Sequence, residues 1–148
     1  MPNRAIEIHD SILAAVSFSQ GEAQLHFSSV YIHQSEGVPL RDAGSGWVQK
    51  AIIRIHDAEV KGAFSEFPVD LSGGHIQIGQ NLLDNEIPVP LRHKGAFELR
   101  LQAMWQGKKL FLSRAAVLNW NCLASRNTWR SFVRNGRSRT GALGATLL

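Results

Sequence analysis

The sequence predicts an all-β protein, an antiparallel β-sandwich or open barrel with a basic C-terminal tail outside the core. Three observations predict it. Apolar residues recur at every second position over most of the chain. Turns that contain glycine follow one another about every ten residues, which makes about eight short strands. Before the tail, no window has a strong amphipathic helical pattern, although 115–124 has the local propensity for a helix.

The first strands form a predicted hairpin, 12–18 and 23–33, joined by a short connection in which Gly21 can take a positive φ. A polar segment rich in glycine, 35–46, then predicts a long loop. Pro88 and Pro90 lack amide donors and confine their strand to a sheet edge. The remaining predicted strands are 47–56, 59–64, 67–71, 74–78, 82–91, 96–105 and 109–117.

The predicted core comes from the apolar faces of these strands. The alternation is cleanest over 96–105, where every second residue from Phe97 to Trp105 is apolar. We expect these seven side chains to be buried: Leu25, Phe27, Ile53, Ile55, Phe97, Leu99 and Leu101.

The size and composition fit one ordinary domain. The chain has 148 residues and 44% hydrophobic residues, and its apolar runs are shorter than the roughly 20 residues of a membrane-spanning helix. The N-terminus lacks the apolar stretch of a secretory signal. Cys122 has no partner cysteine, which agrees with a reducing compartment. We therefore expect a cytoplasmic protein that does not bind membranes.

Acidic and basic residues are distributed unevenly along the chain. Residues 1–98 hold 7 Lys or Arg and 12 Asp or Glu, a net charge of −5, whereas 99–148 hold 9 basic residues and no acidic residue. Together with the loss of alternation, this predicts a β domain over 1–118 and a basic, poorly ordered tail over 119–148. The abrupt change of composition also leads us to infer that the chain leaves its ancestral reading frame near Ser113.

A short motif near the N-terminus carries one resemblance. The segment HDSILAAV at 9–16, followed by the hairpin to Leu25 and Phe27, resembles the opening of small bacterial all-β families, some of them associated with toxin immunity. The resemblance implies a β fold and no particular activity.

Residues that could carry catalysis or hold a metal are dispersed. The six histidines have no metal-ligand spacing, and the His-Asp pairs at 9–10 and 56–57 would point to opposite faces of an extended strand. Asp70, Asp84 and Glu86 lie beside turn residues, where carboxylates cap turns. We therefore predict no metal and no cofactor and favour a protein that is not an enzyme. The histidines are His9, His26, His33, His56, His75 and His93.

Two segments are candidates for binding. The loop 35–46 lies on a rigid sheet, where binding sites often occur, and its candidate residues are Arg41, Asp42, Ser45 and Trp47, the last of which also fits the core. The leading hypothesis is therefore a non-enzymatic binding or accessory protein whose loop and sheet contact a protein or small ligand.

The tail suggests a second function, nucleic-acid binding, because arginines neutralise phosphates and aromatic rings stack on bases. A basic extension that binds polyanions without selectivity explains the same residues. A metal-dependent enzyme built from dispersed His and Asp residues is a third hypothesis. The tail residues are Arg126, Arg130, Arg134, Arg137 and Arg139, with Trp120, Trp129 and Phe132 among them.

Overall fold

A computed structural model describes residues 2–105, 109–121 and 128–132. In these ranges all regular elements are strands, which confirms the predicted all-β fold, and no helix there is long and apolar enough to cross a membrane. The strands are β1 (Asn3–Ser19), β2 (Glu22–Ser35), β3 (Gly44–His56), β4 (Glu59–Lys61), β5 (Val69–Ile78), β6 (Asn81–Asp84), β7 (Glu86–Pro88), β8 (Arg92–Ala103), β9 (Lys109–Asn121) and β10 (Thr128–Phe132).

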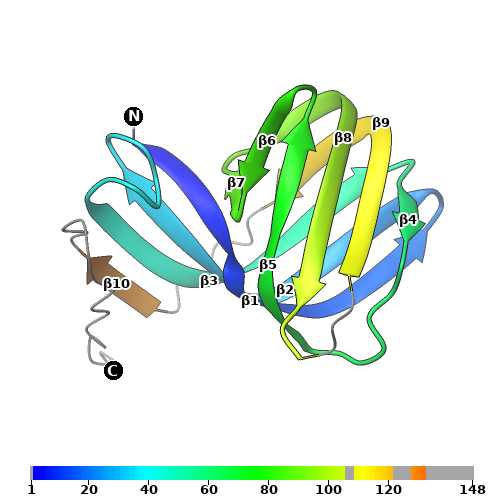
Figure 1. The fold of residues 1–148 in the computed structure, drawn as a ribbon, viewed down its shortest axis with the longest axis horizontal. Helices are drawn as coiled ribbons and strands as arrows, with labels where there is room; N and C mark the ends of the chain where they lie inside the picture. Colours follow the sequence, from blue (N-terminus) through cyan, green and yellow to red (C-terminus); the bar gives the residue numbers. More distant parts are fainter. Residues whose placement is uncertain (1, 106–108, 122–127, 133–148) are drawn as a thin grey trace.

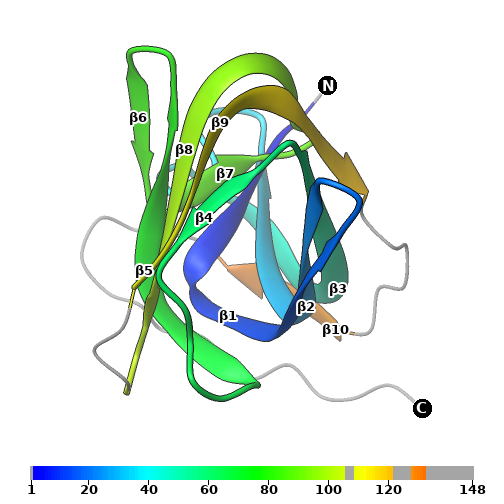
Figure 2. The same ribbon diagram turned by 90° about the vertical axis from the view of Figure 1, so that its right-hand side faces the viewer.

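The strands form one antiparallel sheet that curls into an open barrel (Figures 1 and 2). The path of paired strands is β10-β3-β2-β1-β5-β8-β9-β4, with β6 paired to β5 and β7 paired to β1. β9 also pairs with β3, from Ile52 to Ile55. This additional pairing brings the two halves of the sheet together around the core.

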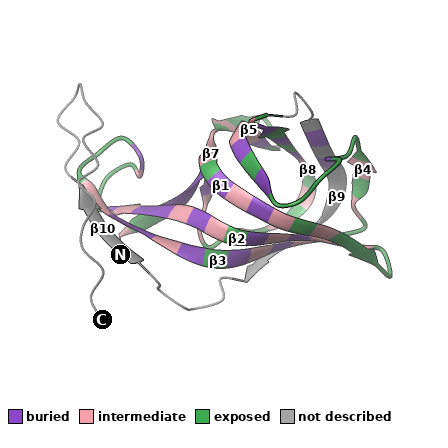
Figure 3. Cartoon of the chain, turned by 90° about the horizontal axis from the view of Figure 1, so that it is seen from below, coloured by how far each residue is buried: buried purple, intermediate pink, exposed green. Residues whose placement is uncertain are grey.

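The three long strands β1, β2 and β3 extend beyond the barrel and form an arm with β10, at the left of Figure 1. We define the arm as 3–7 of β1, 31–35 of β2, 44–48 of β3 and β10. Viewed from below, the arm parts of β2 and β3 contain buried and intermediate residues, and β1 is buried from Ala5 to Ile8 (Figure 3). The arm also carries the loop 36–43 between β2 and β3 at its end.

The predicted hairpin is confirmed. β1 and β2 pair up to Ser19 and Glu22. The connection is Gln20-Gly21, and both residues have positive φ, 50° and 77°, as the tight turns of hairpins require. β1 begins at Asn3, earlier than the predicted 12, because its first residues pair with the end of β2 in the arm.

Several predicted boundaries differ from the observed strands. The predicted strands 67–71 and 74–78 form one strand, β5, with a register shift between Leu71 and Gly73. The predicted strand 82–91 is divided into β6 and β7 by Asn85, which has a φ of 57°. As predicted, these short strands lie at the margin of the sheet, and each pairs with one neighbouring strand in the described ranges.

The C-terminal boundary also differs from the prediction. β9 continues past 118 to Asn121, and the segment after 115 is strand rather than helix because it pairs with both β8 and β3. β10, inside the predicted tail, pairs with Gly44 to Val48 of β3. Residues 122–127 and 133–148 lie outside the described ranges, so the predicted tail stays a prediction.

The core occupies the inside of the barrel and continues into the arm. All seven side chains that the sequence places in the core are buried, which confirms the assigned strand faces. Trp105 is the exception on the 96–105 face, because β8 ends at Ala103 and the Trp105 side chain is 84% exposed.

Leu101 provides a test of this packing. Its side chain is 1% exposed, and on β8 it pairs with Gly74 of β5 and Leu110 of β9. We expect Leu101→Ala to lower the free energy of unfolding by about 2–5 kcal/mol, because the substitution leaves a cavity. Urea unfolding measures the loss. The exposed neighbour Gln102→Ala is the control and should change stability by less than about 0.5 kcal/mol, and an equal effect of both would show that the face is misassigned.

Candidate functional site

The loop 36–43, at the end of the arm, is folded on itself by its own hydrogen bonds. The backbone amides of Arg41 and Asp42 both donate to the carbonyl of Val38, at 3.2 and 2.9 Å. The carboxylate of Asp42 accepts a hydrogen bond from the Val38 amide at 2.6 Å. Leu40 has a φ of 67° and its side chain is buried. The loop is therefore a compact turn with an apolar anchor.

Side chains of the neighbouring strands fix the base of this loop. Asn3 Nδ2 of β1 donates to the carbonyl of Gly37 at 2.8 Å. The hydroxyl of Ser35 donates to the carbonyl of Ala43 and accepts from the amide of Gly37, both at 3.0 Å. These contacts fix both ends of the loop, so the loop does not have to be ordered at the moment of binding.

Two glycines allow this close packing. A Cβ at Gly37 would collide with the carboxylate of Asp42, and a Cβ at Gly44 would collide with the backbone carbonyl of Gln34 on β2. The second collision is with backbone, which cannot move aside as a side chain can. The close approach at both ends of the loop therefore explains why glycine occupies these positions.

An open pocket of about 540 Å³ lies between the loop and the end of β2. Among the described residues that line it, the ionisable side chains are those of Glu36 and Asp42. The hydroxyls of Ser35 and Ser45 and the amide of Gln34 add hydrogen-bonding groups. The lining residues are Pro2, Gln34, Ser35, Glu36, Gly37, Asp42, Ala43, Gly44 and Ser45.

The four predicted loop residues have different positions. Asp42 and Ser45 line the pocket, whereas Arg41 is exposed and does not line it. Trp47 is 5% exposed and belongs to the core cluster, and its Nε1 donates to Gln49 Oε1 at 2.6 Å. The alternative that Trp47 is a core residue is therefore confirmed. Its ring also lies 5.6 Å from the guanidinium carbon of Arg4.

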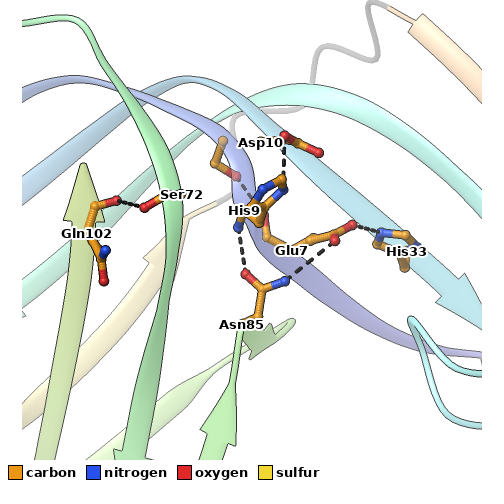
Figure 4. A network of polar contacts seen from close by, with 8 residues as sticks. Glu7, His9, Asp10, His33, Ser72, Asn85 and Gln102 are labelled. Atoms are coloured by element: carbon orange, nitrogen blue, oxygen red, sulfur yellow. Dashed lines mark hydrogen bonds and ion pairs between the residues drawn. The ribbon is translucent and has the colours of Figure 1, made fainter. Parts of the chain in front are cut away.

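A second polar cluster lies within the sheet, where β1 leaves the arm and enters the barrel (Figure 4). His33 Nε2 lies 2.7 Å from Glu7 Oε2, and the two side chains are 8% and 11% exposed. Asn85 Nδ2 donates to the other carboxylate oxygen at 3.5 Å. The Tyr31 ring lies against the His33 ring, with 4.7 Å between centroids.

The polar cluster surrounds an irregularity in β1. Glu7 pairs with Tyr31 and Ile12 with Ser29, so that the four residues 8–11 of β1 span a single residue of β2. Asp10, within this bulge, has a φ of 67°. The bulge bends the strand and allows β1 to pair with β7 before it and with β5 after it.

Asn85 supplies partners for the amides of the bulge. Its backbone carbonyl accepts a hydrogen bond from the Ile8 backbone amide at 3.0 Å, and its Oδ1 accepts one from the His9 backbone amide at 2.7 Å. Ser11 Oγ donates to the carbonyl of Glu7 at 2.7 Å. The polar cluster is thus a buried network that links β1, β2 and the connection between β6 and β7 at the bend.

The histidine predictions need one correction. We expected His9 and Asp10 to point to opposite faces of a strand, but the bulge brings His9 Nδ1 to 2.9 Å from Asp10 Oδ1. His56 Nδ1 contacts Glu22 Oε2 instead of its sequence neighbour, at 3.1 Å. Among the described residues, no group of three or more His, Cys, Asp or Glu could hold a metal ion.

Most of the arginines that the sequence proposes for nucleic-acid binding lie outside the described residues. Arg130 lies in β10, where it pairs with Gly46. Arg126, Arg134, Arg137 and Arg139 lie outside the described residues. Comparisons of the chain with protein-family models, with curated proteins and with solved structures found no match.

Proposed function

We propose that the protein is a non-enzymatic binding module whose site is the pocket at the loop 36–43 and whose ligand carries a cationic group. The ligand is a guanidinium or ammonium group of a partner protein or of a small molecule. We also propose that it acts in the cytoplasm, which its single cysteine favours.

The observation that carries this proposal is the pairing of two carboxylates with a preordered loop. Glu36 and Asp42 line one pocket, and the lining residues that the structure describes include no lysine or arginine, so the local potential favours a positive charge. The pocket volume of about 540 Å³ is within the common range of roughly 300–1,000 Å³ for ligand sites. Charged hydrogen bonds from a guanidinium to carboxylates supply geometric selectivity.

A tri-arginine peptide is a suitable probe, titrated into the full-length protein while the backbone amide signals are followed by NMR. We expect shifts at Gly37, Ala43 and Gly44, which line the pocket. The double substitution of Glu36→Gln and Asp42→Asn should weaken binding by about fivefold, because both carboxylates are exposed and each contributes well under 1.4 kcal/mol.

The matched control is Asp70→Asn, which removes one exposed carboxylate from β5, outside the pocket lining. This variant should bind the peptide as the unmodified protein does. Equal weakening by Asp70→Asn would show that the peptide responds to net charge alone. Shifts confined to residues outside the pocket would contradict the proposed site.

A further inference from the structure

We infer that the outer face of the barrel carries a second binding site, in which Arg54 of β3 and Arg92 of β8 hold a phosphate group. The two arginines lie on either side of β9, whose end lies beside β3 (Figure 2), because Asn119 pairs with Arg54 on one side and with Arg92 on the other. Neither arginine lines the pocket at the loop 36–43, so the inference does not depend on the proposed function.

The register of the strands places both arginines on the same face. Ile53 and Ile55 are buried in the core, so Arg54, which lies between them on β3, belongs to the outer face. Residues paired directly across neighbouring strands share a face, and Arg92 is exposed there. With one strand between them, the Cα atoms of the two arginines are about 10 Å apart, a separation that two arginine side chains can bridge.

The state of the Arg54 side chain points to a ligand. The residue is half-buried, and its Nε is buried without a hydrogen-bond partner among the described residues. In the same ranges Arg54 makes no ion pair, whereas Arg100 and Lys61 each contact a glutamate of their own strand. A half-buried charge without a partner costs free energy, and a bound anion would offset this cost.

The surrounding strands supply no free carboxylate for this charge. Neither β3 nor β9 contains Asp or Glu, and the single acidic residue of β8, Glu98, contacts Arg100. On β2, Glu22 lies diagonal to Arg54, but both of its oxygens are engaged. Its Oε1 accepts a hydrogen bond from Gln24 Nε2 at 2.5 Å, and its Oε2 lies 3.1 Å from His56 Nδ1. The local potential between the two arginines therefore favours an anion.

A phosphate group fits this arrangement better than a carboxylate does. A guanidinium binds two oxygens of one anion through parallel N–H groups. A carboxylate has only two oxygens and one negative charge, whereas a phosphate has enough oxygens and charge for two guanidinium groups. Lys94, which is exposed two residues after Arg92 on the same face, adds a third positive charge. Burial of Nε also restrains the Arg54 side chain before binding, so less side-chain entropy is lost.

The test titrates inorganic phosphate into the full-length protein at constant ionic strength and follows the arginine Nε–H signals by NMR. We expect the Arg54 signal to shift, and Arg54→Gln to weaken the affinity by about tenfold, the effect of losing a charged hydrogen-bonded contact. Arg92→Gln should weaken it by about threefold, because Arg92 is exposed. Glycerol 3-phosphate, titrated in parallel, distinguishes the sources of the group: tighter binding than that of inorganic phosphate identifies an organic phosphate, and equal binding identifies the free ion.

Lys50→Gln is the matched control, because it removes an exposed positive charge from the same face of β3, four residues before Arg54. It should change the affinity by less than about twofold. Equal weakening by Lys50→Gln and Arg54→Gln would overturn the inference, because net charge would then explain the binding.

Urea unfolding separates a ligand site from a structural one. Phosphate should raise the unfolding midpoint of the unmodified protein and leave that of Arg54→Gln unchanged. Without phosphate, Arg54→Gln should unfold at a urea concentration no lower than the unmodified protein does, because the substitution removes an unpaired charge. A lower midpoint would overturn the inference, since Arg54 would then be stabilised by the protein itself.

Discussion

Replacing Glu7 by alanine is expected to lower the free energy of unfolding by about 1–3 kcal/mol, the usual cost of leaving a buried hydrogen-bonding group without its partner. His33 Nε2 lies 2.7 Å from the Glu7 carboxylate, and both side chains are almost fully buried. Without Glu7, the imidazole loses this acceptor and water cannot easily replace it. Asn85 loses the same carboxylate as an acceptor, which weakens the contact between the bulge in β1 and the connection of β6 to β7.

Two further variants define the origin of this loss. Glu7→Gln keeps the shape of the side chain and one acceptor oxygen, so it should cost less than Glu7→Ala. Glu59→Ala removes an exposed carboxylate that lies 3.8 Å from Lys61 Nζ, and it should change stability by less than about 0.5 kcal/mol. Urea unfolding curves of the three variants measure these differences. A Glu7→Ala midpoint equal to that of Glu59→Ala would contradict a structural function for the polar cluster.

The sequence predicts the features of this fold that depend on neighbouring residues. Period-two alternation identifies Phe97, Leu99 and Leu101 as one buried face, because side chains alternate across a strand wherever one face packs on a core. Gly21 marks the hairpin turn for a similarly local reason, the need for a positive φ. These features follow from the chain within a few residues of each position.

Features that depend on distant residues could not be predicted in the same way. The partner of Glu7 is 26 positions away, and Asn85 lies 78 positions from it. Alternation also fails at the bulge, where Asp10 adopts a left-handed conformation and the two faces are no longer distinguished by odd and even numbers.

The candidate pocket was only partly predictable from the sequence. Loop composition points to the region of Asp42 and Ser45, and both line the pocket. Glu36 was missed because a lone carboxylate in a polar loop has no distinguishing pattern. The available signal was a pair of glycines, Gly37 and Gly44, at the two ends of the loop, where each permits a close approach.

The apolar alternation of β9 is interrupted at position 114 and continues at Ala116, Leu118 and Trp120. Leu110 and Leu112 are buried, and the register pairs Leu112 with Leu99 and position 114 with Phe97, which is also buried. Position 114 is therefore the next position of this core row. The sequence has an arginine there, where the alternation predicts an apolar residue. This mismatch supports our proposal that the chain leaves its ancestral reading frame at this point.

A shifted reading frame supplies a more suitable ending. Codons formed from the third base of one residue and the first two of the next must give Glu at the junction of Trp120 with Asn121, and Leu at that of Asn121 with Cys122. When the free codons elsewhere are chosen for an alternating strand, the shifted frame from Arg114 to Val133 can be read as Gly-Ser-Arg-Ala-Glu-Leu-Glu-Leu-Leu-Gly-Glu-Pro-Lys-Tyr-Val-Glu-Glu-Phe-Arg. This ending restores acidic residues and an alternating strand, and it places a Gly and Pro turn after that strand.

A chain that carries this shifted ending after Ser113 has its apolar residues at 117, 119 and 121, whereas the present chain has Ala116, Leu118 and Trp120 at the even positions that continue Leu110 and Leu112. If the shifted ending is ancestral, β9 must pair one residue out of its present register to bury these residues, and the shifted chain should be at least as stable as the present chain. Urea unfolding of the two chains measures the difference, and a chain with the same shifted residues in shuffled order controls for composition. The shuffled chain should be less stable than the shifted chain, because its alternation is lost. Sequencing the gene gives an independent test, since a stop codon soon after Ser113 in the shifted frame would rule out the ancestral ending. A shifted chain that is less stable than the present chain would contradict the same proposal on physical grounds.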